Sequence, residues 1–320
     1  MDLFPVTHQR TASRVAIMAS EGKTKPRRYA PFGTPMEAAK VPPGLYLVAT
    51  PIGNLGDITL RALETLAGAD IIACEDTRVT RKLTGRFGIT TPLTAYHEHN
   101  AAEARPKLLS RLADGQSVAF VSDAGTPLIS DPGFKLVRAA RDAGHQVSTS
   151  PGPSAVLAAL AVGGLPTDRF FFEGFLPPKQ AARQKRIATL SNVQATLVLF
   201  ESGSRIASTL ADLAAALGPR IAAICRELTK LHEEVKCENL DVLARLYADG
   251  AETRGEFVIL VAPPTETPDA DEVDALLKHA LSRVSVKDAV GEVAAATGRP
   301  RREIYQRALA LTKDGEDDAE

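Results

Sequence analysis

The 320-residue chain has no tryptophan, and aromatic residues make up only 5% of it. Because 44% of the residues are hydrophobic, a large core is possible, but it must consist mainly of alanine, leucine, valine and isoleucine. Neither sign of charge predominates: 38 Lys and Arg residues stand against 39 Asp and Glu residues, and the formal net charge is -1. A nucleic-acid partner would therefore have to be bound by a local basic patch, since an overall basic field is excluded.

Cysteine is also scarce. The three cysteines, Cys74, Cys225 and Cys237, are widely spaced and odd in number, so neither a disulfide framework nor a CxxC metal site is indicated. We expect free thiols in a reducing compartment. No apolar run approaches the roughly 20 residues that span a bilayer, and the apolar stretch 15–19 is shorter than a signal-peptide core. The sequence thus predicts a cytoplasmic protein.

Residues 1–43 lack hydrophobic periodicity and carry an excess of basic side chains. We expect a flexible basic arm here. Three interpretations of it stay open: a dispensable extension, a start codon placed too early, with Met18 and Met36 as later candidates, and an arm that binds RNA. The first two are favoured over the third.

From residue 44 onward, short apolar runs of strand type alternate with segments of helical spacing. A first lobe, 44–166, is predicted to have strands at 45–49, 71–73, 117–121 and 146–149, with helices from 60, near 103–114, near 133–143 and from 154. Strands that alternate with helices favour a mostly parallel sheet covered on both faces, as in α/β proteins. Asp57 stands where the N-cap of the first helix is expected.

The sequence GGLP at 163–166 interrupts this pattern, and a second α/β lobe is expected over 167–263. Its predicted strands are 170–172, 196–200, 221–224 and 257–261, and its predicted helices are 179–191, 204–217 and 239–248. A linker with two prolines follows. A small helical domain of three short helices is then expected over 271–311, with an acidic tail at 312–320.

The glycine- and proline-rich segment 122–133 directly follows a predicted strand, at the sheet edge where open α/β sheets bind ligands. The chain contains no GxGxxG or GxxxxGK[ST] pattern, and Asp123 would repel a phosphate. A cationic, hydroxyl-bearing ligand such as S-adenosylmethionine suits Asp123 better. Gly125 allows close backbone approach, while Ser130 or Asp131 is expected to cap the next helix.

Two further loops of this kind, 50–57 and 151–154, also follow predicted strands of the first lobe. Any one of the three could be a routine turn. Three such loops at strand ends of one sheet predict a ligand site.

The motif string TPIGNLGD (50–57), CEDTR (74–78), HEHN (97–100), SDAGTPLISDPG (122–133), PGPSA (151–155), CRELTK (225–230) and RGEFVILV (254–261) resembles the tetrapyrrole-methylase-like methyltransferases. Within that superfamily the chain is similar to the ribosomal RNA small subunit methyltransferase I family, which methylates a cytidine 2′-hydroxyl. The likeness covers about residues 44–263 and extends to the helical tail. It implies two α/β lobes with a cofactor cleft between them and a homodimer.

The resemblance also implies S-adenosylmethionine as cofactor, no metal, and a cytidine ribose of 16S ribosomal RNA in the small subunit as substrate. Carried over by motif, the residues expected to contact the cofactor are Pro51, Gly53, Asp123, Ala124, Gly125, Thr126, Ser154 and Ala155, with Ser202 and Arg226 from the second lobe.

A ribose hydroxyl is a weak nucleophile, so a general base should contribute roughly 10²–10⁴-fold. The candidates are Glu75, Asp76 and Glu227, although each could instead form an ion pair or a loop-fixing hydrogen bond. The polar side chains expected on the substrate side are Arg78, His97, Asn100 and Lys230. A metal site at His97 and His99 is disfavoured because no third ligand lies at a recognisable spacing.

RNA phosphates could be bound by Lys179, Arg183 and Arg186, which would share one face of a helix. A solvated helix face without function is the alternative. A second basic group, in the helix-turn-helix-like tail, could position RNA or contact a second copy; it comprises Arg299, Arg301, Arg302 and Arg307.

Two other functions stay open. A tetrapyrrole (corrin) methyltransferase would use the same cofactor loops, but the polar CEDTR and HEHN strings favour RNA. A non-enzymatic RNA-binding scaffold would bind no cofactor, and the intact loops around Asp123 argue against it.

Overall fold

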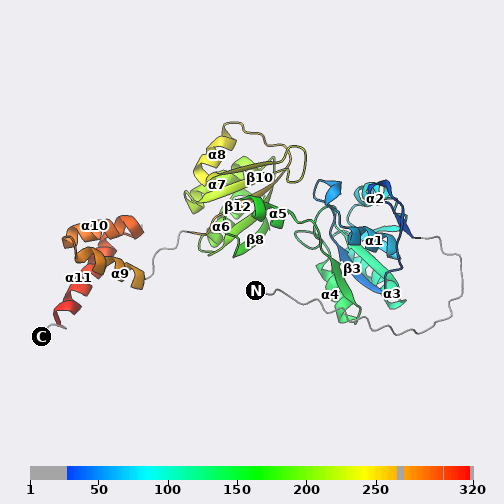
Figure 1. Cartoon of the computed structure of the whole chain (residues 1–320), viewed down its shortest axis with the longest axis horizontal. Helices are drawn as coiled ribbons and strands as arrows, with labels where there is room; N and C mark the ends of the chain where they lie inside the picture. Colours follow the sequence, from blue (N-terminus) through cyan, green and yellow to red (C-terminus); the bar gives the residue numbers. More distant parts are fainter. Residues whose placement is uncertain (1–26, 265–269, 298, 318–320) are drawn as a thin grey trace. The chain divides into compact units, whose positions relative to one another are not determined.

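The computed structural model describes residues 27–264, 270–297 and 299–317 (Figure 1). By its internal contacts the chain divides into two units. The first contains the residues up to Ala158 together with Leu228–Leu231, and the second contains Ala159–Glu227 and the residues from His232 onward. Each unit has its own sheet, and the two are described separately.

The sheet of the first unit is entirely parallel, in the order β5-β4-β6-β3-β7. Its strands are β3 (Gly44–Val48), β4 (Ile71–Cys74), β5 (Leu93–Ala95), β6 (Ser117–Val121) and β7 (Val147–Ser150). Every residue of β4 and β6 is buried. Continuous apolar runs of this kind are what a parallel strand covered on both faces requires.

Helices cover both faces of this sheet (Figure 1). On one face, α1 (Leu60–Gly68) and α2 (Thr77–Arg86) share a core cluster with Ile72, to which Leu66 and Leu83 contribute. On the other face, α3 (Ala101–Ala113) and α4 (Phe134–Asp142) share a cluster with Phe120. A fifth helix, α5 (Ala155–Val162), follows β7. The predicted three-layer α/β arrangement is confirmed.

Two helix starts differ from the prediction. The N-cap of α1 is Thr59, whose side chain accepts a hydrogen bond from the Ala62 N–H at 3.0 Å, while Asp57 lies in the preceding 3-10 turn (Leu55–Asp57). Helix α4 follows Gly133, which makes no side-chain cap, so Ser130 and Asp131 belong to the loop and not to the helix start.

The expectation of a flexible arm over 1–43 is wrong for the described residues 27–43. They form a small hairpin of β1 (Arg28–Tyr29) and β2 (Met36–Glu37) with the 3-10 turn Pro31–Gly33. Burial of the Tyr29 ring, which is 5% exposed, ties the hairpin to the first core, and Ala30 N–H donates to the Phe87 carbonyl at 2.7 Å. Residues 1–26 lie outside the described part.

The sheet of the second unit is mixed, in the order β11-β10-β12-β9-β8, with only β8 and β9 parallel. Its strands are β8 (Phe170–Phe175), β9 (Thr196–Ser202), β10 (Ile221–Arg226), β11 (Glu234–Asn239) and β12 (Glu256–Val261). Strand β11 was not predicted, because it is a polar edge strand without an apolar run.

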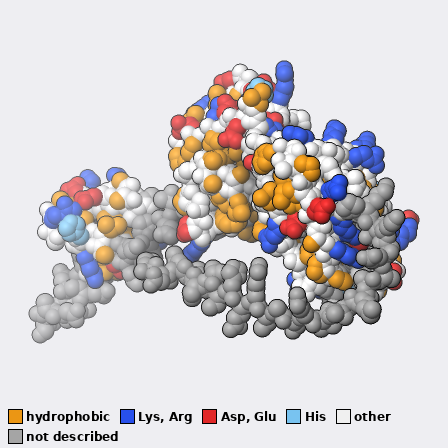
Figure 2. All heavy atoms as spheres, turned by 45° about the vertical axis from the view of Figure 1, so that its right-hand side comes forward, with side chains coloured by type: hydrophobic (Ala, Val, Ile, Leu, Met, Phe, Trp, Pro, Cys, Tyr) orange, Lys and Arg blue, Asp and Glu red, His pale blue; other side chains and the backbone are white. Residues whose placement is uncertain are grey.

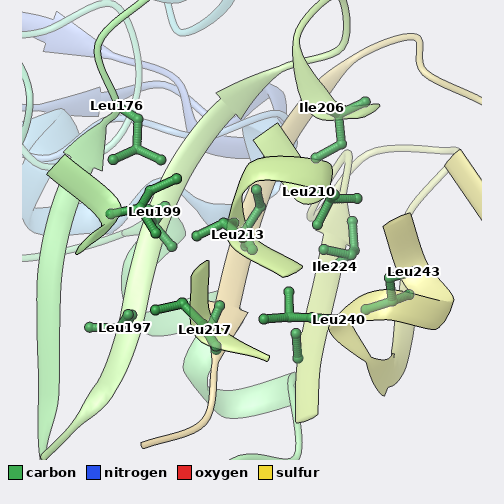
Figure 3. Close-up of a cluster of buried hydrophobic side chains, with 14 of the residues drawn as sticks. Leu176, Leu197, Leu199, Ile206, Leu210, Leu213, Leu217, Ile224, Leu240 and Leu243 are labelled. Carbon is green, nitrogen blue, oxygen red and sulfur yellow. The ribbon is translucent and has the colours of Figure 1, made fainter. Parts of the chain in front are cut away.

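Three helices, α6 (Gln180–Leu190), α7 (Ile206–Leu217) and α8 (Leu240–Ala248), pack on this sheet. Leucine and isoleucine side chains from the helices and from β9 and β10 meet in one cluster (Figure 3). A core of aliphatic side chains is what the low aromatic content predicted.

The C-terminal part is helical, as predicted, with α9 (Ala270–Leu281), α10 (Val286–Thr297) and α11 (Arg301–Asp317). A separate cluster that includes Leu277, Val293 and Ile304 holds the three helices together. Helix α11 continues beyond residue 311 into the expected acidic tail. Across the described residues, we find no helix with the length and apolar character needed to cross a membrane.

Candidate active site

The three glycine- and proline-rich loops converge at the carboxyl edge of the first sheet. Thr50, after β3, exchanges two backbone hydrogen bonds with Gly125, after β6, at 2.9 and 3.0 Å. The Thr126 hydroxyl donates to the Pro153 carbonyl, after β7, at 3.1 Å. The loops of β3, β6 and β7 are thus tied into one surface, as strand order alone would suggest.

Gly125 is one residue at which this surface depends on glycine. Its φ of 76° lies in the left-handed region, and an added Cβ would lie 3.2 Å from the Ile52 side chain. A larger residue would therefore be strained and crowded at the point where the loops of β3 and β6 join. At the far end of the same surface, the Ser154 hydroxyl accepts a hydrogen bond from Leu157 N–H at 3.4 Å in the first turn of α5.

The loop 50–57 has a second neighbour. The segment Leu228–Leu231 groups with the first unit, and the side chain of Lys230 fills the space in which a Cβ of Gly53 would lie. The structure thus brings together Lys230, expected on the substrate side, and Gly53, expected to contact the cofactor. Pro51 of the same loop is buried.

Asp123 connects the loop of β6 with that of β4, because its Oδ1 atom accepts a hydrogen bond from the Asp76 N–H at 3.0 Å. Burial raises the pKa of Asp123, and the nearby carboxylate of Asp76 adds to the rise. A positively charged ligand at this edge would offset both effects.

Glu75 and Asp76 are adjacent in the chain, but their carboxylates differ in their contacts, and that of Asp76 is held by hydrogen bonds. Its carboxylate caps α2 through the Arg78 N–H at 2.7 Å and forms an ion pair with the Arg78 guanidinium at 2.6 Å. These hydrogen bonds lower the pKa of Asp76 to about 2. Burial, followed by the charges of Asp123, Asp131 and Asp76, raises the pKa of Glu75. Of the two, Glu75 is the carboxylate whose pKa is shifted towards protonation, which favours it over Asp76 as a proton acceptor.

The expected helix cap Asp131 is a further member of this group. Burial raises its pKa, a hydrogen bond with the Ser122 side chain opposes that rise, and the charge of Asp123 adds to it. The loop also holds Leu128 at φ 76° and Ser130 at φ 64°. Left-handed backbone at non-glycine residues costs about 1–2 kcal/mol per residue, and strain of this kind is concentrated at functional sites.

The loop after β5 brings His97 and Asn100 to the same edge, because β5 is the neighbour of β4. The Asn100 side chain accepts from His97 N–H at 2.8 Å and donates to the Ala95 carbonyl at 3.0 Å. Within the described residues, the buried Nδ1 atom of His97 has no hydrogen-bond partner. The Asn100 side chain therefore fixes the conformation of the loop, while the Nδ1 atom of His97 could still form a hydrogen bond with a ligand.

The remaining candidates lie at one edge of the second sheet. Ser202 ends β9, Arg226 ends β10, and Glu227 follows it in a left-handed conformation with φ 51°. Arg226 contacts Glu234 at 3.3 Å. The Glu227 carboxylate accepts a hydrogen bond from Glu256 N–H at 2.9 Å, so it holds the turn that enters β12.

The expected exposed basic face on α6 is wrong. Arg183 is 4% exposed and its guanidinium lies 2.7 Å from the carboxylate of Asp212 on α7. Arg186 is paired with Glu173 at 2.6 Å. The sequence signal for this was present, since Arg183 shares its helix face with the buried residues Ile187 and Leu190. Lys179 alone of the three stays exposed without an ion pair in the described structure.

The C-terminal basic group is also partly neutralised. Arg299 contacts Glu303 at 2.5 Å, and Arg307 contacts Asp274 at 2.5 Å. Arg301 and Arg302 are exposed.

Comparisons with known proteins agree with this fold. A family model described as tetrapyrrole (corrin/porphyrin) methylases matches residues 44–244, and one described as the RsmI C-terminal HTH domain matches residues 267–312. Among solved structures, diphthine synthase is 18% identical with a TM-score of 0.54, covering 68% of this chain and 89% of that one. Cobalt precorrin-4 methyltransferase, also 18% identical, has a TM-score of 0.51 and covers 68% and 94%. These structures show the fold alone.

Curated relatives are more similar. A protein of Mesorhizobium japonicum named ribosomal RNA small subunit methyltransferase I is 52% identical over 87% of this chain and 95% of its own length. One of the same name from Xylella fastidiosa is 48% identical over 82% of this chain and 98% of its own length. The chain therefore belongs to the tetrapyrrole methylase family and, within it, to the ribosomal RNA small subunit methyltransferase I family.

Proposed function

We propose that this methyltransferase transfers the methyl group of S-adenosylmethionine to the 2′-hydroxyl of a cytidine ribose in the 16S ribosomal RNA of the small subunit. The observation that carries the proposal is the tied loop surface around Asp123 and Glu75, in a chain whose relatives are named as small-subunit RNA methyltransferases. The site of action would be the cytoplasm.

The carboxyl edge of the first sheet suits this cofactor chemically. Asp123 offers a carboxylate to a sulfonium or to ribose hydroxyls, and its burial, with the charge of Asp76, raises its pKa, an effect that a bound cation would offset. The residues proposed to line the cofactor are Pro51, Gly53, Asp123, Ala124, Gly125, Thr126, Ser154 and Ala155. Ser202 and Arg226 are proposed to contribute from the second unit.

When bound, the cofactor supplies an electrophilic methyl group on a positively charged sulfur. Glu75 is proposed to accept the proton of the ribose 2′-hydroxyl as the new oxygen–carbon bond forms and the carbon–sulfur bond breaks. A base in this position contributes roughly 10²–10⁴-fold. Asp76 is not suited to this role because its carboxylate is held by Arg78, and Glu227 is less suited because its carboxylate accepts from Glu256 N–H.

Arg78, His97, Asn100 and Lys230 are proposed to face the RNA. Arg183 is withdrawn from this group because it is buried against Asp212, and Arg186 is occupied by Glu173. A homodimer is proposed as the working state on the strength of the family resemblance. Arg78, His97, Asn100 and Lys230 would form a polar surface. Such a surface suits a ribose better than it suits the apolar face of a corrin ring.

The direct test is transfer of a labelled methyl group from S-adenosylmethionine to purified small ribosomal subunits and to their naked RNA. We expect label in the small-subunit RNA and none in protein. Absence of transfer to both substrates would exclude the proposal. Label on a tetrapyrrole precursor, offered in a parallel reaction, would favour the corrin alternative.

A further inference from the structure

We propose that the exposed face of α2 formed by Arg78, Arg81, Lys82 and Arg86, hereafter the α2 basic face, binds the phosphate backbone of the RNA. The inference rests on the proposed function, because it names the surface that receives the RNA beside the reaction site. It takes the place of the α6 face, on which Arg183 and Arg186 have acidic partners.

Helix α2 has the sequence TRVTRKLTGR, with four basic residues and no acidic residue. Its buried side contains Thr80, Leu83 and Thr84. Arg78, Lys82 and Arg86 are spaced four residues apart, and Arg81 lies next to them, so the four cations form one stripe. Arg81, Lys82 and Arg86 are exposed, and the side chain of Arg78 is 85% exposed.

Acidic side chains neutralise only part of the charge of the α2 basic face. Arg78 is paired with Asp76, but no acidic side chain in the described ranges forms an ion pair with Arg81, Lys82 or Arg86. Like charges four residues apart destabilise a helix, and Arg78 in the first turn opposes the helix dipole, whereas Arg86 in the last turn favours it. Arg81, Lys82 and Arg86 therefore repel one another on an exposed face, with no acidic partner among the described residues to offset the repulsion. A polyanion bound along the stripe would relieve the repulsion.

Gly85 is a second feature of α2 that supports a ligand surface there. It lies inside α2, three residues after Lys82 and four after Arg81, and an added Cβ would meet nothing within 4 Å. Internal packing thus does not require a glycine here, although glycine weakens a helix. Because Gly85 has no side chain, it leaves open space on the α2 basic face, where a ligand backbone can approach closely.

The position of α2 relates the stripe to the reaction site. The helix begins directly after Asp76, whose N–H donates to Asp123 at 3.0 Å. Ten residues of α-helix span about 15 Å, so the stripe starts at the carboxyl edge and leads away from it. Figure 2 shows Lys and Arg side chains gathered on the part of the first unit that carries α2 in Figure 1.

An RNA backbone fits this surface better than a lipid membrane does. Val79 is the large hydrophobic side chain of α2 that is exposed, at 39%. Helices that bind lipid surfaces combine basic residues with a broad apolar face that enters the bilayer. On α2 the apolar side packs instead into the core of the first unit. Contacts to phosphates need only exposed cations and carry no sequence information.

The test compares Arg81→Gln/Lys82→Gln with a matched control, Lys107→Gln/Arg111→Gln on α3, which packs on the opposite face of the sheet. Binding of a small-subunit RNA fragment is measured at several salt concentrations. We expect the α2 variant to bind roughly tenfold more weakly at low salt, with a salt-dependence slope reduced by about 2. The control should bind like the wild type. The affinity for S-adenosylmethionine and the kcat of methyl transfer should not change, while KM for RNA rises.

Thermal melting checks that both variants fold, and Arg86→Glu provides a second variant at an exposed position, for which a larger loss is expected. RNA binding by the α2 variants equal to that of the control would overturn the inference, even if the wild type methylates RNA. Loss of RNA binding in the α2 variants without methyl transfer by the wild type would refute the proposed reaction but support the surface. If the wild type bound no ribosomal RNA, both would be refuted.

Discussion

Glu75 and Asp76 are neighbours in the chain, yet their carboxyl groups have opposite properties. Arg78 and the start of α2 hold Asp76 in its ionised form, with a pKa of about 2. Its contribution to stability is therefore present above the usual pKa near 3.8 and is lost as the pH falls towards 2. Burial and three nearby carboxylates shift Glu75 the other way. The role of each residue follows from its contacts and not from its residue type.

We predict that Glu75→Gln lowers the rate of methyl transfer roughly 10²–10⁴-fold. Because the pKa of Glu75 is raised above 4.5, the wild-type rate should fall as the pH drops through that raised value, where the carboxylate becomes protonated. Single-turnover rates measured across pH should show this acidic limb, and the variant should lack it. Asp76→Asn is the matched control. It should lose stability at the start of α2 but retain an acidic limb; a limb lost in Asp76→Asn instead would assign the base to Asp76.

Asp123→Ala should weaken the binding of S-adenosylmethionine about 10–150-fold, the range expected when a hydrogen bond to a charged group worth about 1.5–3 kcal/mol is lost. Titration calorimetry of the variant measures this directly. The control is Asp114→Ala, an exposed aspartate at the end of α3, remote in the fold from the carboxyl edge. Equal affinity in the Asp123 variant and the wild type would place the cofactor elsewhere.

Helices and strands differ in how clearly the sequence predicts them, because their sequence signals differ in type. The strand 117–121 was predicted with its observed bounds because a buried parallel strand is a continuous apolar run. Strand β11 and helix α2 were missed because EVKCEN and TRVTRKLTGR contain few apolar residues, so their periods are carried by polar side chains and not by an apolar run. The site loops could be anticipated because they follow strands, whereas the place of Asp131 depends on the tertiary fold.

Helix α6 shows how a charge pattern can mislead. Its basic residues have helical spacing, but Arg183 lies on the buried side and pairs with Asp212. We predict that Arg183→Ala lowers the free energy of unfolding by about 3–5 kcal/mol, because it leaves the carboxylate of Asp212 buried without its partner. Urea unfolding measures the loss. Lys185→Ala, at an exposed position on the same helix, should change stability by less than about 0.5 kcal/mol.

The whole molecule has a formal net charge of -1, so its electrostatics is decided by where cations are neutralised. In the second unit, Arg183 and Arg186 have acidic partners. In the first unit, Arg78 of α2 is paired with Asp76, whereas Arg81, Lys82 and Arg86 form no ion pair within the described residues, and the helix begins next to the carboxyl edge. A chain of nearly balanced charge can therefore present a local basic surface to RNA.

The proposed reaction places the methyl group on a ribose hydroxyl and not on a base. A methyl group on O2′ removes the internal nucleophile by which alkali cleaves RNA, so the linkage that follows it resists hydrolysis. The most direct measurement is alkaline hydrolysis of small-subunit RNA after reaction with labelled S-adenosylmethionine. We predict label in alkali-resistant dinucleotides that yield 2′-O-methylcytidine on further digestion. Label released as an ordinary mononucleotide with a methylated base would contradict it.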